Sequence, residues 1–409
     1  EKMTKKNNVY ITHGVRTAIG KIGKSLKDTC DTELAVHVIK NLVEERAKLD
    51  PNEIDQVIFG EVKQKSNPAN VARVAALQAG IPETVPAYTV NRQCGSGLQS
   101  IIDAFELIKI GEANLIIAGG VENMSQSVYY MRNAKDGLKN GHFVIEDSLI
   151  AGGPGAVPVE KYGVWPMGLT AEKLAEVYHI TREEQDAFAM SSQVKMHNAM
   201  EAGRFKEQIV PIPVQDHGQE ILFDTDEHPF LSSMEKLAKL TPAFKSGGSV
   251  TAGNSSGRND GASAVLVMSE EKMKELGYQP MARIISVGSS GCDPTVMGLG
   301  PVESSKLAMK RAGLTLHDLD IIELNEAFAA QSIAVIKEWE KLGISEDELL
   351  PKLNPNGGAI AHGHPLGNTG AALTIKCMYE MQRRENAKYG MITMCCAGGV
   401  GVAAIIEKW

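Results

Sequence analysis

Short apolar runs alternate with amphipathic segments near both ends of this chain. Residues 9–13 and 53–61 are apolar runs of strand length, and we predict a buried strand in each. Residues 32–48 carry apolar side chains at helical spacing, and residues 69–79 read as a helix of small residues. Strands that alternate with helices in this way predict an α/β fold with helices packed on parallel-rich sheets.

One stretch joins a short extended run, residues 86–90, to an amphipathic helix that begins near Gly95. This places Cys94 at a helix N-terminus, where unpaired backbone N–H groups and the helix dipole favour an anion such as a thiolate. The small residues Gly95, Ser96 and Gly97 let a substrate approach the sulfur closely. We interpret Cys94 as a nucleophile; the alternative is a buried structural cysteine.

The same order of elements returns late in the chain. It runs helix, buried strand, small-residue corner, helix, and a strand followed by two glycines. In the second occurrence these elements are residues 304–312, 319–326, 363–370, 371–381 and 391–397. We interpret the repeat as an internal duplication of a βαβ-type unit, which brings equivalent corners together about a pseudo-twofold axis.

A different kind of sequence separates the two occurrences. Residues 125–166 are rich in Gly, Pro, Tyr and Met and read as loops, whereas residues 170–203 are helical with a capping box from Thr181 to Glu184. Residues 211–244 are polar and extended. An insertion of this size is too long for a passive linker, so we expect a lid or a ligand-binding domain.

The overall composition is that of a globular protein with room for two or three domains. The chain has 409 residues, 43% of them hydrophobic and 22% charged, and a formal net charge of −8. The acidic balance and the lack of a basic run argue against a nucleic-acid partner. No apolar run reaches the length of a membrane-spanning helix, so we expect no membrane partner either.

The cysteines and the chain ends predict a reducing compartment. The six cysteines include no Cys-x-x-Cys pair, residues 1–8 lack the apolar core of a secretory signal, and residues 407–409 are not a peroxisomal address. We therefore expect a cytoplasmic protein with reduced thiols.

The duplication predicts that four candidate groups meet in one site. His364 lies in a glycine-rich turn, where an imidazole can take the proton of a nearby thiol. Cys395 and Cys396 end an apolar strand; we expect one to pack in the core and the other to face the site as an acid–base thiol. Asn325 stands at a strand end, where it either reaches the site or caps a helix.

Two other interpretations compete for these motifs. His362 and His364 are spaced for a metal, but no third ligand follows, and we expect no metal. Residues 253–257 match the Gly-x-Ser-x-Gly pattern of serine hydrolases, which requires a preceding strand and a following helix. Here we predict a following strand over residues 262–268, so this context is wrong for a hydrolase.

Five motifs resemble those of the thiolases, and among these the acetyl-CoA acetyltransferase type. They cover nearly the whole chain in order and comprise residues 91–98, 119–125, 325–331, 356–367 and 395–401. The resemblance implies an acetyl-CoA C-acetyltransferase, which reversibly condenses two acetyl-CoA to acetoacetyl-CoA plus CoA by a ping-pong reaction. The alternatives are a degradative 3-ketoacyl-CoA thiolase of broader chain length and, remotely, a non-catalytic protein that binds acyl-CoA or lipid.

The resemblance also implies an architecture. It predicts a duplicated thiolase fold of two βαβαβαββ-type halves in α/β/α/β/α layers. The N-terminal half would be residues 1–126 plus 253–280, the inserted loop domain 127–252, and the C-terminal half 281–409. The loop domain would bind CoA, and residues 127–141 resemble a tetramerisation loop, so we expect a homodimer or homotetramer.

The resemblance assigns catalytic roles residue by residue. Cys94 matches the acylated nucleophile, and His364 matches the histidine that activates it. Cys395, not Cys396, matches the second acid–base cysteine, and Asn325 matches the asparagine that positions a water beside His364 in one oxyanion hole. The second oxyanion hole would use the backbone N–H groups of Cys94 and Ala397. Oxidation that joins Cys94 to Cys395 is a further hypothesis.

The substrate-binding residues follow from the same resemblance. A small-molecule acyl-CoA would contact Met167, Ser256, Phe244, Met297 and Phe328, and no cofactor is implied. Two positions depart from the family pattern: Pro166 where a histidine is often found, and Phe230 near a common arginine. Both affect the expected acyl length and how the nucleotide end of CoA is held.

Overall fold

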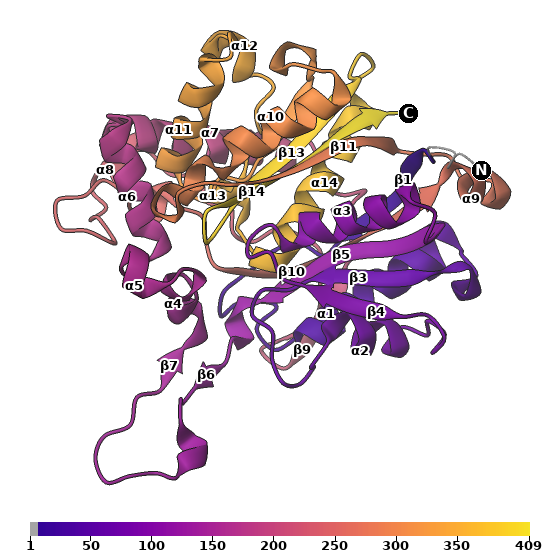
Figure 1. Ribbon diagram of the computed structural model, residues 1–409, viewed down its shortest axis with the longest axis horizontal. Coiled ribbons are helices and arrows are strands. Elements are labelled where there is room, and N and C mark those ends of the chain that lie inside the picture. The colour runs from indigo at the N-terminus through magenta and orange to yellow at the C-terminus, as the bar shows by residue number, and fades with distance from the viewer. Residues whose placement is uncertain (1–6) are drawn as a thin grey trace.

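The computed structural model describes residues 7–409. Residues 1–6 lie outside the described residues, and they make up most of residues 1–8, for which we expect no secretory signal. One mixed sheet of ten strands runs through the molecule (Figure 1). From one edge, the N-terminal half contributes β4 (Ala87–Val90), β3 (Gln56–Gly60), β5 (Leu115–Asn123), β10 (Asn259–Ser269) and β1 (Val9–Arg16). The C-terminal half continues with β11 (Ala282–Gly291), β14 (Val400–Lys408), β13 (Tyr389–Cys396) and β12 (Ile321–Leu324). The short β2 (Gly20–Lys21) pairs with β10.

The two half-sheets have the same strand order, which confirms the internal duplication. Counted from the seam, β1-β10-β5-β3 in one half corresponds to β11-β14-β13-β12 in the other. The seam is a short antiparallel pairing of residues 9–11 with residues 282–284. A parallel bridge from Ile322 to Leu353 occupies the place where β4 pairs with β3.

The expectation of parallel-rich sheets is wrong. Among the described strands of this sheet, the parallel ladders are β3 with β4, β3 with β5, and β12 with β13. The five successive ladders along the path β5-β10-β1-β11-β14-β13 are antiparallel. The cause of the error is burial: strands covered on both faces read as continuous apolar runs in either direction. The pattern along one strand therefore reveals its burial but not the direction of its neighbour.

Helices cover the half-sheets and also separate them, which gives the predicted α/β/α/β/α layers. In Figure 1, α3 (Ser96–Lys109) and α14 (Leu366–Arg383) lie between the strands of the two halves. The outer layers are α1 (Asp31–Lys40) with its π-helical continuation (Asn41–Ala47) and α2 (Val71–Gln78) on the N-terminal half, and α10 (Gly300–Ala312) and α11 (Ala329–Glu340) on the C-terminal half. Short helices α9 (Glu270–Leu276), α12 (Glu346–Leu349) and α13 (Ala359–His362) complete the halves.

Alternation along each strand connects the layers. Val57 and Phe59 belong to the outer core beneath α1 and α2, whereas Ile58 between them belongs to the central core around α3 and α14. In the other half, Met391 faces the outer core and Ile392 the central one. Successive side chains of a strand point to opposite faces, so each strand contributes to two cores.

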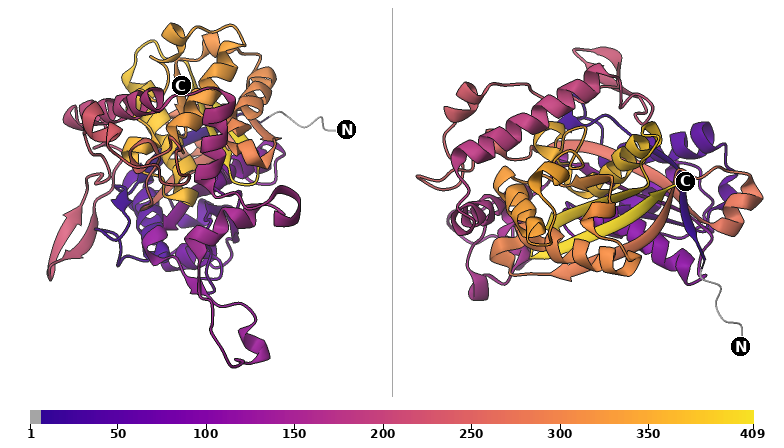
Figure 2. Two further views of the ribbon diagram at one scale, coloured as in Figure 1. Left: turned by 90° about the vertical axis from the view of Figure 1, so that its left-hand side faces the viewer. Right: turned by 90° about the horizontal axis from the view of Figure 1, so that it is seen from above.

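The inserted segment joins β5 to β10 and contains both hairpins and helices. Its elements are β6 (Tyr129–Tyr130), β7 (Glu146–Asp147), α4 (Ser148–Gly152), α5 (Val159–Tyr162), α6 (Met167–Val177), α7 (Arg182–Glu201), β8 (Ile212–Asp216), β9 (Gln219–Phe223) and α8 (Met234–Ala238). The predicted capping box is present at the start of α7, but α6 begins three residues before the predicted start of the helical region. The β6–β7 hairpin projects away from the body (Figure 2). Within residues 7–409, none of the helices has the length and apolar character that a membrane crossing requires.

Candidate active site

Hydrogen bonds between residues 92–96 and the small size of Gly95 form the corner that carries Cys94. β4 ends at Val90 and α3 begins at Ser96, so Cys94 precedes the first turn of a helix. The Ser96 hydroxyl accepts a hydrogen bond from the Arg92 N–H at 2.8 Å and donates to the Gln93 carbonyl at 2.6 Å. A Cβ on Gly95 would lie 2.7 Å from the Cys396 sulfur, so only glycine fits between the corner and β13.

Cys94 opens into a cavity of about 410 Å³ that brings together groups from both halves and the inserted segment. His364 and Cys395 line the same cavity, and so does Ala397. All five residues expected to contact substrate line it too: Met167, Ser256, Phe244, Met297 and Phe328. A cavity of this volume falls in the range of small-molecule sites.

His364 is buried and held on both ring nitrogens. Its Nδ1 lies 2.6 Å from the Thr369 hydroxyl, and its Nε2 lies 3.4 Å from the Asn325 amide nitrogen. Burial lowers the pKa of His364 to about 4, so the imidazole is neutral at pH 7. With Nδ1 protonated toward Thr369, Nε2 is free to accept a proton, which is the tautomer that the amide donor of Asn325 favours.

Asn325 stands behind His364 rather than in the cavity wall. It is fully buried, its backbone N–H donates to the Thr393 carbonyl at 3.0 Å, and its side-chain oxygen has no partner among the described residues. A buried amide oxygen without a partner is costly, and an ordered water is the usual remedy. The side chain reaches His364 and does not cap a helix, which decides between the two alternatives for this residue.

The Cys94 thiol is protonated at rest, contrary to the expectation drawn from its helix N-terminus. Burial raises its pKa to about 11, although the backbone N–H groups of Ala397 and of Cys94 itself act in the opposite direction. Lys63 also lowers this pKa, and Glu122 raises it. Enclosure by protein therefore outweighs the helix terminus, and a base is required to form the thiolate.

The two consecutive cysteines of β13 point in opposite directions, as predicted. Cys395 belongs to the core cluster beside the cavity, whereas Cys396 packs in the central core against Gly95. Burial, then the neighbouring Cys94, raises the pKa of Cys395 well above its ordinary value. Cys395 thus holds its proton beside Cys94, and both thiols are free.

Sequence reasoning missed two supporting residues. Thr369 orients His364, and Glu122 accepts backbone N–H bonds from Val62, Lys63 and Gly367 at 2.9–3.0 Å, which fastens the corner after His364 to the N-terminal half. Glu122 was visible only as part of a motif, because its role depends on three backbone groups distant in sequence.

The competing motifs do not build sites of their own. The Ser255 hydroxyl donates to the Thr251 carbonyl at 2.6 Å, and β10 follows it rather than a helix. His362 faces Asp226 at 3.1 Å and stacks on Phe205, away from the cavity. Among the residues that the structure describes, no group of three or more His, Cys, Asp or Glu is placed to hold a metal ion.

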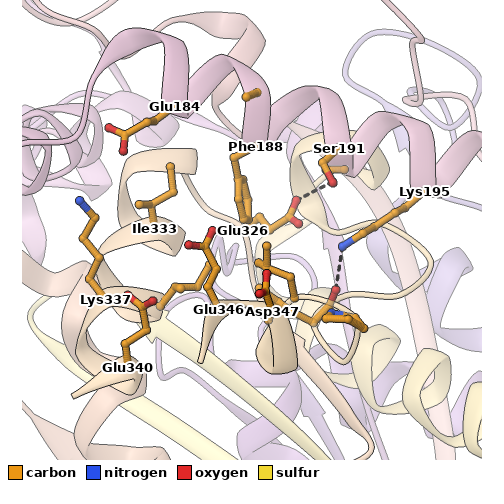
Figure 3. Close-up of a pocket in the computed structure, with 16 residues that line it drawn as sticks. Glu184, Phe188, Ser191, Lys195, Glu326, Ile333, Lys337, Glu340, Glu346 and Asp347 are labelled. Carbon is orange, nitrogen blue, oxygen red and sulfur yellow. Dashed lines mark hydrogen bonds between the residues drawn. The ribbon is translucent and has the colours of Figure 1, made fainter. Parts of the chain in front are cut away.

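A second, larger hollow of about 670 Å³ lies between α7, α11 and α12 (Figure 3). Its walls carry Phe188 and Ile333, and Lys195 and Glu340 are among its charged residues. It holds no cysteine or histidine. Glu326, the neighbour of Asn325, lines it, but Ser192 and Asn354 already hydrogen-bond its carboxylate.

Comparison with known proteins agrees with this geometry. The family model of the thiolase N-terminal domain matches residues 9–271, and that of the thiolase C-terminal domain matches residues 278–408. The acetyl-CoA acetyltransferase of Syntrophomonas wolfei is 47% identical over 403 residues, which cover 98% of each chain. The acetyl-CoA acetyltransferase of Pseudomonas aeruginosa is 46% identical over 405 residues, 98% of this chain and 99% of that one.

Solved structures are similar over the same extent. The crystal structure of the Bacillus anthracis acetyl-CoA acetyltransferase matches with a TM-score of 0.93 and 43% identity, covering 99% of both chains. Human mitochondrial 3-ketoacyl-CoA thiolase in complex with CoA matches with a TM-score of 0.91 and 40% identity, covering 98% of both chains.

A duplicated α/β fold with a cysteine, a neutral imidazole and a second thiol around one cavity defines a thiol-dependent acyltransferase. The family models cover nearly all of the chain, and the similar structures cover it equally well. The chain belongs to the thiolase family and has the thiolase fold.

Proposed function

We propose that this protein is an acetyl-CoA C-acetyltransferase that transfers acetyl groups through Cys94. The single observation that carries the proposal is that Cys94, His364 and Cys395 line one cavity although they come from separate corners of the two halves. The names of the relatives from Syntrophomonas wolfei and Bacillus anthracis support acetyl-CoA as substrate.

The proposed first half-reaction uses the protonation states of the site. His364 Nε2 takes the Cys94 proton, the sulfur attacks the thioester carbonyl of acetyl-CoA, and the CoA thiol leaves with the proton of Cys395. His364 is then protonated and Cys395 is a thiolate. The backbone N–H groups of Cys94 and Ala397, which already face the sulfur, would stabilise the oxyanion. The product is an acetyl-Cys94 intermediate.

The second half-reaction forms the carbon–carbon bond. A second acetyl-CoA loses an α-proton to the Cys395 thiolate that the first half-reaction leaves, and the resulting enolate attacks the acetyl carbonyl on Cys94. A water beside His364 Nε2 and Asn325 would donate to the enolate oxygen. Acetoacetyl-CoA leaves, and Cys94 regains its proton from His364; the reverse sequence is thiolysis.

Acylation mass spectrometry tests the proposal directly. Incubation with acetyl-CoA should add one acetyl group to Cys94, and Cys94→Ser should lose about 10³-fold or more of acetoacetyl-CoA thiolysis because it removes the nucleophile. Cys30→Ser is the matched control, since Cys30 lies at the start of α1 outside the cavity. Acetylation elsewhere, or full activity of Cys94→Ser, would refute the proposal.

The remaining properties follow from this proposal. The substrates are CoA thioesters, no cofactor takes part, and the functional units are the halves 1–126 plus 253–280 and 281–409 with the loop domain 127–252. We place the protein in the cytoplasm as a homodimer or homotetramer. The two departures from the family pattern bear on acyl length differently: Pro166 lines the cavity, whereas Phe230 is 68% exposed and lies outside its lining.

A further inference from the structure

Lys63 places a positive charge in the wall of the cavity that holds Cys94, and nothing in the acetyl transfer above uses it. The cavity is lined by two cationic side chains, Lys63 and Arg258, and by no carboxylate among the described residues. An anionic group on a ligand would therefore find attractive charges and no carboxylate among the side chains that line this cavity.

The position of Lys63 is fixed by its backbone. Its N–H donates to Glu122 at 3.0 Å, and the same carboxylate accepts the Gly367 N–H at 2.9 Å, just after His364 and Pro365. One buried side chain thus ties Lys63 to the corner that carries the base. The carbonyl of the preceding residue, Val62, accepts a hydrogen bond from the Asn91 side chain at 3.4 Å, three residues before Cys94, which places this segment beside the nucleophile corner.

The Lys63 ammonium group has a hydrogen-bond partner but forms no ion pair among the described residues. Its Nζ donates to the Ser148 carbonyl at 2.7 Å, and a Cβ on Gly152 would lie 2.0 Å from it, so the absence of a side chain at Gly152 leaves room for the charge. Within residues 7–409, no carboxylate lies within 4.0 Å of Nζ. Glu122 and Asp147 act on it from farther away, and burial lowers its pKa. An ammonium has three donors, and one is used.

The phosphates of CoA cannot account for this charge. The pantetheine arm separates them from the thioester by its whole length, whereas Lys63 lines the cavity on a segment that is hydrogen-bonded to the Cys94 corner. Arg258, which is exposed and two residues from Ser256, fits the CoA portion instead. A cation beside the nucleophile addresses the acyl chain.

We propose that Lys63 recognises a terminal carboxylate on the acyl chain, so that 3-oxo-dicarboxylyl-CoA thioesters are preferred substrates for thiolysis. This inference rests on the proposed function and names a substrate class for the same site. Leu149 and Ile150 of the inserted segment line the cavity near this charge and would pack on the methylene groups of the chain.

The chemistry is that of thiolysis, with atoms conserved. For 3-oxoadipyl-CoA, Cys94 sulfur attacks C3 and its proton passes to His364; the C2–C3 bond breaks, and C2 takes the Cys395 proton to give acetyl-CoA. A CoA thiol then attacks succinyl-Cys94, which yields succinyl-CoA, and the protons return to Cys94 and Cys395. Lys63 changes no bond and holds only the distal carboxylate.

The test compares 3-oxoadipyl-CoA with its monoamide, which has the same size and no terminal charge. The wild type should show kcat/KM at least about tenfold higher for the acid, as a charge-assisted hydrogen bond predicts. Lys63→Met should bring this ratio to within about twofold of one, and Lys63→Arg should retain most of it. Arg258→Met is the matched control: it should lower both values together and keep the ratio.

The outcomes separate this inference from the proposed function. A wild-type ratio near one, or a ratio that Lys63→Met leaves intact, overturns the inference while turnover of acetoacetyl-CoA by the wild type upholds the function. Loss of all turnover and of Cys94 acylation in the wild type overturns both. If Lys63→Met does not fold, the wild-type ratio and its decrease with salt decide the matter.

Discussion

His364 and Cys94 form a neutral pair at rest, and this decides how the thiol responds to pH. The imidazole has a pKa of about 4 and the thiol one of about 11, both displaced by burial in the direction that disfavours charge. With these values, about one thiol in ten thousand is ionised at pH 7. At rest the site therefore contains a neutral imidazole, which is a base, beside a protonated thiol, rather than a thiolate.

This pair predicts the pH dependence of alkylation. Because His364 stays unprotonated above about pH 5 and the Cys94 pKa lies near 11, the rate of reaction with iodoacetamide should rise about tenfold per pH unit from pH 6 to pH 9 without a plateau. Mass spectrometry of the Cys94 peptide measures the rate, with glutathione as the reference thiol. A plateau below pH 8 would instead reveal a thiolate–imidazolium pair and contradict the geometry.

At the scale of single residues, the sequence was sufficient to predict positions but not protonation states. The opposite directions of Cys395 and Cys396 follow from the strand period alone, and the location of Cys94 follows from the run-to-helix junction. The state of its thiol does not follow, because the desolvation comes from segments far away in sequence. Thr369 lies within the predicted corner 363–370, yet its contact with His364 depends on the first turn of α14.

The strands and helices are held in place by glycines that allow backbone contact between them. Gly120 of β5 is the clearest case: a Cβ there would lie 2.0 Å from the Gly367 carbonyl oxygen at the start of α14. The close approach brings α14 to the carboxylate of Glu122 and sets the place of His364. Such contacts could not be predicted from the sequence, because two consecutive glycines are equally typical of a loop and of a close contact between two backbones.

Gly120→Ala should therefore destabilise the protein and disturb the site together. We expect a loss of about 1–3 kcal/mol, because the new methyl group meets backbone that cannot rotate away. Differential scanning calorimetry should show a thermal midpoint lower by several degrees, with a lower kcat. Gly155→Ala is the control, since no atom lies within 4 Å of the position that its new methyl group would take. Equal midpoints for the two variants would contradict this account.

The sequence predicted the order of elements better than their arrangement. The repeat of helix, strand, corner and helix was visible, and the two half-sheets have matching strand orders. The direction of neighbouring strands was not visible, because both faces of each strand are buried. The start of α6 also shifted by three residues, since this helix begins directly after Pro166, whereas the helix predicted over residues 32–48 is present as α1 and its π-helical continuation, residues 31–47.

The β6–β7 hairpin, residues 129–147, contributes no residue to the hydrophobic core clusters of the described chain. The hairpin projects from the body (Figure 2). Its loop exposes apolar side chains, including Leu138, Phe143, Val144 and Ile145. Exposed apolar groups of this extent are typical of an interface between subunits.

Replacement of residues 131–145 by a short glycine linker should therefore change assembly and spare the chemistry. We expect the native mass, measured by light scattering after gel filtration, to be lower than that of the unmodified protein by at least half. Acetylation of Cys94 should persist, because no residue of 131–145 lines the cavity. An unchanged native mass would show that assembly uses another surface.

The seam between β1 and β11 gives the molecule a mechanical property. Among the described residues, the two half-sheets pair as strands over residues 9–11 and 282–284 alone, and the nucleophile lies on one side while the base and second thiol lie on the other. A small sliding of one half against the other thus alters the sulfur-to-nitrogen separation directly. Hydrostatic pressure favours the state of smaller volume, so the rate of acetyl transfer should respond to pressure before the fold does.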